Sequence, residues 1–380
     1  MANGSRNDRR STMNYWNYIR VEELLSLQGG TTGDESKLTN DEVVFITVHQ
    51  VYELWFKLAL REIVRARDIF RQNPVPDTEM SAAVRSLKRI TVLFEQAVSH
   101  FKVVETLTTR DYLEFRDKLI PASGFQSAQI REIEVLLGLE DGMRVPLGKE
   151  KSFLEALKGA GGTASPALTR VQKRLADRPS LKEALYEWLT RTPIYGGEHS
   201  EEGTVHFLRA FLDAHKKDAG DRMSRAMTAA GSAVDADEIR ARYEREMKNA
   251  EAFLFAEEDP TATPEQKRRR RDVRAAAVFL ESYRELPRLA WAREVIDSVL
   301  EMEQTMIVWR QRHARMVERV IGRRVGTGGS SGVDYLDETA LKYRVFLDLW
   351  GVRALLLRAP ILPPVEHEET YRFVVEDVSS

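Results

Sequence analysis

The chain of 380 residues contains no cysteine. This absence excludes disulfides, thiolate-ligated metals, iron–sulfur clusters and a cysteine nucleophile, and it is what we expect of a cytoplasmic protein. A metal ion, if one is bound, must therefore be held by histidine, aspartate, glutamate or a cofactor.

The chain also lacks a strong charge of one sign and a long apolar run. Its formal net charge is −2, so no global field draws it to nucleic acid or to a membrane surface. No run of 18 or more apolar residues is present, and the polar N-terminus lacks the apolar core of a secretory signal. We therefore expect neither a nucleic-acid nor a membrane partner.

Apolar side chains recur at helical spacing through most of the chain. Residues 41–72 start with polar and acidic residues, keep apolar residues three and four positions apart, and stop near Pro74. Similar patterns predict helices within 80–107, 108–121 and 127–138. A further pattern over 273–322 pauses at Pro287. Period-two alternation is almost absent, so the sequence predicts an all-α helical bundle.

The middle of the chain differs in composition. Residues 157–169 are rich in Gly, Ala and Ser and predict a loop. Residues 196–275 are polar and charged, and we interpret them as helices and loops inserted on the main bundle rather than as a second catalytic domain. The run "KRRRR" (267–271) is either a nucleic-acid patch or a solvated face beside the acids of 238–258. The near-neutral net charge favours the solvated face.

Two histidines lie on strongly apolar helical segments. His49 follows Phe45 by four residues, and His313 follows Trp309 by four. Residues at this spacing share a helix face, so each imidazole points the same way as a large aromatic ring. The alternative for either histidine taken alone is a hydrogen-bonded core residue.

Three further features add to the two histidines. Tyr112 and Arg116, also four apart, place a phenol beside a guanidinium suited to a small carboxylate, although a packed Tyr beside a surface Arg is the alternative. The turn "PASGFQS" (121–127), with Ser123 and Gly124, brings backbone close to a ligand or merely connects two helices. The loop "GTGGSSG" (326–332) lacks the lysine of a phosphate-binding loop, and a mobile lid with Thr327 as its polar group fits better.

Together these stretches resemble the tryptophan 2,3-dioxygenase family. The matching segments occur in family order between residues 15 and about 350 and are "NYWNYIRVEELLSLQ", "DEVVFITVHQVYELWFK", "DYLEFRDKLIPASGFQS", "WRQRHARMVERVIG" and "GTGGSSGVDYL". The resemblance implies a haem b enzyme that cleaves the indole C2–C3 bond of L-tryptophan with dioxygen, giving N-formylkynurenine.

The resemblance also implies roles for particular residues. His313 matches the proximal ligand of the haem iron, and His49 matches the histidine near the indole N–H. The residues expected on the cofactor side are His313, Trp309, Ser123 and Gly124. The residues expected to contact the substrate are Phe45, Tyr112, Arg116 and Thr327. The N-terminal segment that reaches a neighbouring subunit's pocket in the family is matched by Tyr15, Tyr18 and Ile19, which implies a homotetramer.

On this basis we divide the chain into four parts. Residues 1–40 form the arm that contributes to a neighbouring subunit. Residues 41–150 and 271–380 form the two parts of the haem- and substrate-binding bundle. Residues 151–270 form a variable helical insertion.

Two departures from the family pattern and several rival functions remain. Trp16 and Asn17 stand where the family often has smaller residues, and Asp337 stands where it often has a basic one. A related haem enzyme that inserts one oxygen atom into tryptophan or β-methyltryptophan is the nearest alternative. A haem-binding sensor without turnover and a purely structural helical oligomer are alternatives of other classes.

Overall fold

The described part of the chain is all helical, as the sequence predicts. The structure is a computed structural model that describes residues 14–119, 126–146, 153–158, 162–194, 200–230, 236–324 and 332–373, and no strand occurs among them. The α-helices are α1 (Tyr15–Ile19), α2 (Val21–Leu25), α3 (Asn40–Phe70), α4 (Asp77–Val104), α5 (Thr109–Arg116), α6 (Ala128–Leu137), α7 (Pro166–Ala176), α8 (Leu181–Leu189), α9 (Glu201–Ala230), α10 (Ala236–Leu254), α11 (Pro264–Ser282), α12 (Ala290–Ile321), α13 (Val333–Lys342) and α14 (Leu347–Arg353).

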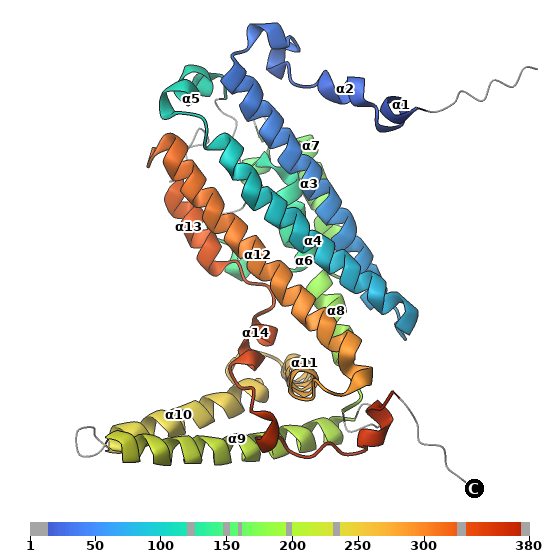
Figure 1. The fold of residues 1–380 in the computed structure, drawn as a ribbon, viewed down its shortest axis with the longest axis vertical. Helices are drawn as coiled ribbons and strands as arrows, with labels where there is room; N and C mark the ends of the chain where they lie inside the picture. Colours follow the sequence, from blue (N-terminus) through green and yellow to red (C-terminus); the bar gives the residue numbers. More distant parts are fainter. Residues whose placement is uncertain are drawn as a thin grey trace, which may run out of the picture.

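Three long helices, α3, α4 and α12, run side by side and form the frame of the molecule (Figure 1). Helix α3 starts where the Thr39 side chain accepts a hydrogen bond from the Glu42 amide, and it ends at Phe70, shortly before Pro74. Its buried stripe includes Val48, Tyr52 and Phe56. The predicted helix over 41–72 is therefore confirmed almost to its ends.

Helix α6 lies in the centre of the bundle, and all of its residues are buried. It ends at Gly138, whose φ of 102° is the left-handed conformation that favours glycine. A Cβ at this position would lie 2.8 Å from the Ser180 hydroxyl oxygen. Gly138 therefore both ends α6 and permits the close approach of the turn before α8.

The segment expected to be an insertion does not behave as one unit. Helices α7 and α8 pack against α6 and α3, and Leu181, Leu185 and Leu189 belong to the main core. The predicted loop over 157–169 is too long, because Ser165 caps α7 and a proline fits its first turn, so that the helix starts at Pro166. Helices α9 and α10 pack on each other and cross the foot of the bundle (Figure 1).

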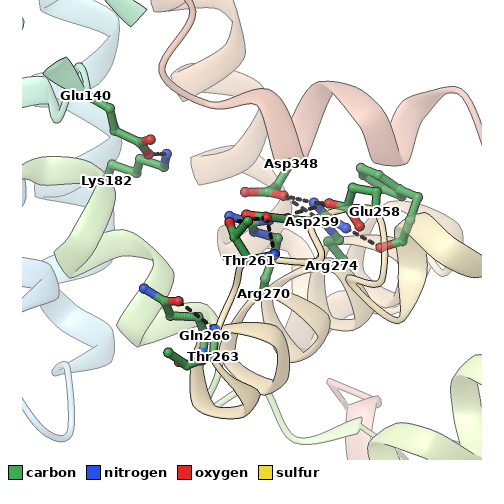
Figure 2. Close-up of polar contacts among 11 residues, drawn as sticks. Glu140, Lys182, Glu258, Asp259, Thr261, Thr263, Gln266, Arg270, Arg274 and Asp348 are labelled. Carbon is green, nitrogen blue, oxygen red and sulfur yellow. Dashed lines mark hydrogen bonds and ion pairs between the residues drawn. The ribbon is translucent and has the colours of Figure 1, made fainter. Parts of the chain in front are cut away.

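The basic run 267–271 lies on α11 and is paired with acids. Arg269 contacts Glu187, Arg270 lies near Glu258, and Arg271 contacts Glu201. Of the three acids, only Glu258 belongs to the predicted stretch 238–258, and the Arg271 side chain is 11% exposed, so the run is paired with acids but is not solvated throughout. The buried Arg274 lies one turn further along and bonds to Glu258 and Asp348, which joins α11 to α14 (Figure 2).

Helices α1 and α2 lie apart from the bundle (Figure 1), and neither has a buried residue. Among the described helices, α3 alone is long and apolar enough to cross a membrane by length and composition. This is weak evidence for a membrane span, since the core helix of a globular protein passes the same test. The contacts of α3 with α4, α6 and α8 are those of such a core helix.

Candidate active site

A large cavity opens among α3, α4, α5, α6, α12 and α13. The empty space within it, open mouth included, is about 1330 Å³. Its lining is mostly apolar, with Phe56, Phe101, Val104 and Met316 among the walls. Such a lining suits a largely apolar ligand.

His49 lines this cavity from α3. Its Nδ1 lies 2.7 Å from the carbonyl oxygen of Phe45, so in the neutral ring Nδ1 carries the proton and donates it. Burial lowers the pKa of His49 below its ordinary value, against opposing effects of the Phe45 carbonyl and Glu53. The neutral ring therefore keeps an unprotonated Nε2, which can accept a hydrogen bond from a ligand.

His313 lines the same cavity from α12. Burial, together with the nearby His49 and Arg310, lowers the pKa of His313 to about 4. The imidazole is therefore neutral at physiological pH and has a lone pair available for a metal. Its ring stacks against that of Trp309, with ring centroids 5.5 Å apart, as the spacing of four residues predicts.

Helix α5 brings Tyr112 and Arg116 to the cavity. The helix starts where the Thr108 side chain accepts a hydrogen bond from the Asp111 amide. Burial raises the pKa of the Tyr112 hydroxyl, and the neighbouring Arg116 opposes this rise. The ring of Phe45 lies 4.1 Å from that of His49 and 5.9 Å from that of Tyr112. A guanidinium, a phenol and an aromatic face therefore meet on one side of the cavity.

A second group of charges lies on the α6 side. The Glu134 carboxylate contacts three guanidiniums, those of Arg131, Arg144 and Arg310, at 2.8–3.0 Å. Burial alone would raise its pKa, but the three cations lower the pKa of Glu134 to about 2. Of these four residues, Arg131, Arg310 and Glu134 line the cavity. Two cations and one carboxylate give this wall an excess positive charge, which suits an anionic ligand group.

The residues predicted from the sequence fall into three sets. Five lie at the cavity or against a residue of its wall, and these are Phe45, His49, Tyr112, Arg116 and His313. Trp309 also lines the cavity beside His313. Three candidates lie outside the described residues, namely Ser123, Gly124 and Thr327.

The third set is on α1. The side chains of Tyr15, Tyr18 and Ile19 are 73%, 75% and 42% exposed and line no part of the cavity of their own chain. Trp16 and Asp337 are two of the residues that depart from the family pattern. Trp16 is exposed on the same helix. Both carboxylate oxygens of Asp337 accept hydrogen bonds from Nη2 of Arg315.

Sequence reasoning missed several residues of the cavity wall, among them Tyr52, Phe101, Arg131, Glu134, Arg310, Tyr335 and Thr339. The aromatic ones follow the same apolar periodicity as core residues, so their spacing holds no separate signal. Arg310 precedes His313 by three residues and therefore lies on the same face of its helix, which is the one local hint that the sequence offered.

The residues present fit a haem better than a bare metal ion. No group of three or more His, Asp or Glu side chains in the described ranges could hold an ion alone. One neutral imidazole is enough for an iron that a porphyrin already holds. The apolar walls suit the porphyrin faces, and the excess cations around Glu134 suit the carboxylates at its edge.

Comparison with known proteins agrees with this arrangement. The model of the family described as tryptophan 2,3-dioxygenase matches residues 1–356. A tryptophan 2,3-dioxygenase from Sorangium cellulosum is 62% identical over 99% of this chain and 92% of its own length. Tryptophan 2,3-dioxygenase 2 from Ralstonia nicotianae is 55% identical over 96% of this chain and 98% of its own length. A tryptophan 2,3-dioxygenase-like protein from Xanthomonas campestris is 53% identical over 71% of this chain and 99% of its own length. The chain belongs to the tryptophan 2,3-dioxygenase family.

Proposed function

We propose that this chain is a haem-dependent oxidoreductase that cleaves the indole C2–C3 bond of L-tryptophan with dioxygen to give N-formylkynurenine. The observation that carries the proposal is one cavity that joins the neutral, metal-competent imidazole of His313 to the group formed by His49, Tyr112 and Arg116. Family membership supports the same reaction.

In this proposal His313 would supply a nitrogen ligand to the haem iron. Arg131 and Arg310, which line the cavity beside Glu134, would face the haem carboxylates, and Trp309 packs beside His313. A bound haem supplies the redox chemistry of dioxygen, which amino-acid side chains do not provide. Ser123 and Gly124 are proposed to contact the haem on the resemblance alone.

The amino acid is held by charge and its indole by a hydrogen bond. Arg116 binds the carboxylate, because a guanidinium can donate two parallel hydrogen bonds to it, and Tyr112 lies beside this pair. The unprotonated Nε2 of His49 accepts a hydrogen bond from the indole N–H, and Phe45 packs on the ring. Thr327 is proposed to bind the ammonium and carboxylate. The apolar cavity excludes water, which strengthens each of these polar contacts.

The proposed assembly is a homotetramer in which the arm of one subunit completes the cavity of the next. The large exposed side chains on α1 support this, because Tyr15 and Tyr18 are about three-quarters exposed in the single chain. Such residues on a helix with no buried face need a partner surface.

The product formed from tryptophan under ¹⁸O-labelled dioxygen tests the proposed reaction. We expect the reduced holoprotein to give N-formylkynurenine with both oxygen atoms labelled. One labelled atom in an oxindole-type product would instead indicate the mono-oxygenating alternative. Haem uptake without any tryptophan-dependent spectral change would indicate a sensor. The control is His313→Ala, which should lose the haem or the reaction. A variant with a normal haem spectrum and full activity would contradict the ligand assignment.

A further inference from the structure

Two aromatic rings pack on one side of the His313 imidazole. Phe101 of α4 lies with its ring centroid 5.6 Å from that of His313 and an angle of 5° between the planes. Trp309 of α12 lies at 5.5 Å and 26°. The centroids of Phe101 and Trp309 are themselves 6.2 Å apart, so the three rings form one cluster that supports the imidazole from one side.

The two rings are themselves held firmly. Phe101 is 1% exposed and Trp309 is 7% exposed. The edges of Phe56 and Phe94 pack on Trp309 at 5.6 and 5.9 Å, and Tyr52 packs on Phe101 at 5.2 Å. Rotating the His313 ring toward Phe101 or Trp309 would therefore require core residues to move.

No hydrogen bond to another residue orients the His313 ring in the described part of the chain. The ionisable groups that act on it are His49 and Arg310, and neither is a carboxylate. Metal-binding histidines commonly donate their second N–H to a carboxylate, a carbonyl or a water, which fixes the ring orientation. Here stacking takes the place of that side-chain contact.

We propose that Phe101 is a positioning residue for the haem ligand, and that Phe101 and Trp309 together support the His313 imidazole from one side. This inference rests on the proposed haem function. It predicts that the ring of Phe101, rather than its volume, keeps the ligand nitrogen aimed into the cavity.

The test compares ring-free and ring-keeping variants. Phe101→Met retains apolar volume but removes the ring, whereas Phe101→Tyr keeps the ring. Phe94→Met is the matched control, because Phe94 lies on the same helix, is also 1% exposed and also packs on Trp309, but does not line the cavity. Phe101→Leu is a second ring-free variant for use if Phe101→Met does not fold.

The readouts are the iron–histidine stretching band of the ferrous protein and the rate of haem loss to excess apomyoglobin. We expect Phe101→Met to broaden or shift the band and to lose haem about tenfold faster than Phe94→Met, the size typical of a lost ligand-orienting contact. Phe101→Tyr should resemble wild type. Equal behaviour of Phe101→Met and Phe94→Met, with haem bound normally in wild type, would overturn the positioning role of Phe101 alone. Failure of wild type to take up hemin would overturn the proposed function as well.

Discussion

At the scale of single residues, the position of one proton on His49 decides what the ring can do. Because Nδ1 donates to the Phe45 carbonyl, Nε2 is left as an acceptor. If His49 only orients the indole through a hydrogen bond to Nε2 and removes no proton, its loss should slow the reaction but not stop it.

His49→Ala should therefore slow turnover about 5–150-fold without abolishing it, since a buried donor left without its acceptor costs roughly 1–3 kcal/mol. The measurement is kcat with tryptophan, normalised to bound haem. Complete loss of activity with haem retained would show that His49 is an obligatory base instead.

The same histidine predicts an acid limb in the pH profile. Burial lowers the pKa of His49, so the ring should stay neutral at pH 7 and lose its acceptor only below the usual histidine range. Activity should be level near neutral pH and fall on acidification below pH about 6.5. A kcat/KM profile of His49→Ala should lack this fall. An acid limb of equal size in the variant would assign it to another group.

Replacing Arg116 should weaken the binding only of ligands that carry a carboxylate. Arg116→Gln should weaken tryptophan binding by about 2–4 kcal/mol, because a buried carboxylate would be left unpaired. Tryptophanamide lacks the charge, so its binding should change little. Spectral titration gives the affinity of each variant for tryptophan and for tryptophanamide. An equal loss of affinity for the two ligands would contradict the pairing of Arg116 with the carboxylate.

At the scale of the elements, α6 carries a carboxylate that joins three segments. Glu134 binds Arg131 on its own helix, Arg144 after it and Arg310 on α12. Because the carboxylate pKa is lowered from 4.5 to about 2, its stabilisation is complete above its usual pKa and disappears as pH falls through about 2.

Glu134→Gln should lower the free energy of unfolding by about 3–5 kcal/mol, since it leaves buried guanidiniums uncompensated. The matched control is Asp337→Asn, which breaks an ion pair about 45% exposed and should cost less than about 1 kcal/mol. Urea unfolding of both variants compares them, and similar costs would mean that the Glu134 group is well hydrated.

The elements themselves could be predicted from the sequence, whereas the charged α6 side of the cavity wall could not. The capped start and proline stop of α3, and the glycine end of α6, are local signals, and the structure confirms both helices. Glu134 and Arg310 lie 176 positions apart, so only the tertiary fold brings them together. Phe101 follows the same apolar spacing as Leu87 or Phe94, and periodicity cannot distinguish a cavity wall from a core.

At the scale of the whole molecule, the exposed arm predicts an assembly. Light scattering should give about four times the 43.5 kDa of one chain. Replacing Tyr15, Tyr18 and Ile19 by serine should weaken tryptophan binding and leave haem bound. The control replaces Leu341 and Leu347, which are 70% and 51% exposed elsewhere, and should change neither property. A monomer that turns over normally would contradict the shared cavity.

The size of the cavity has a consequence for the life of the protein in the cell. If the cavity takes the proposed haem, the apoprotein lacks the contacts that the haem would make with the apolar walls, and its fold is weaker than that of the holoprotein. Haem at about a thousand times its Kd would raise the free energy of unfolding by roughly 4 kcal/mol. On this proposal, newly made copies that bind haem should escape proteolysis, whereas copies made during iron starvation should be degraded. Steady-state abundance would then follow haem biosynthesis even at a constant rate of transcription.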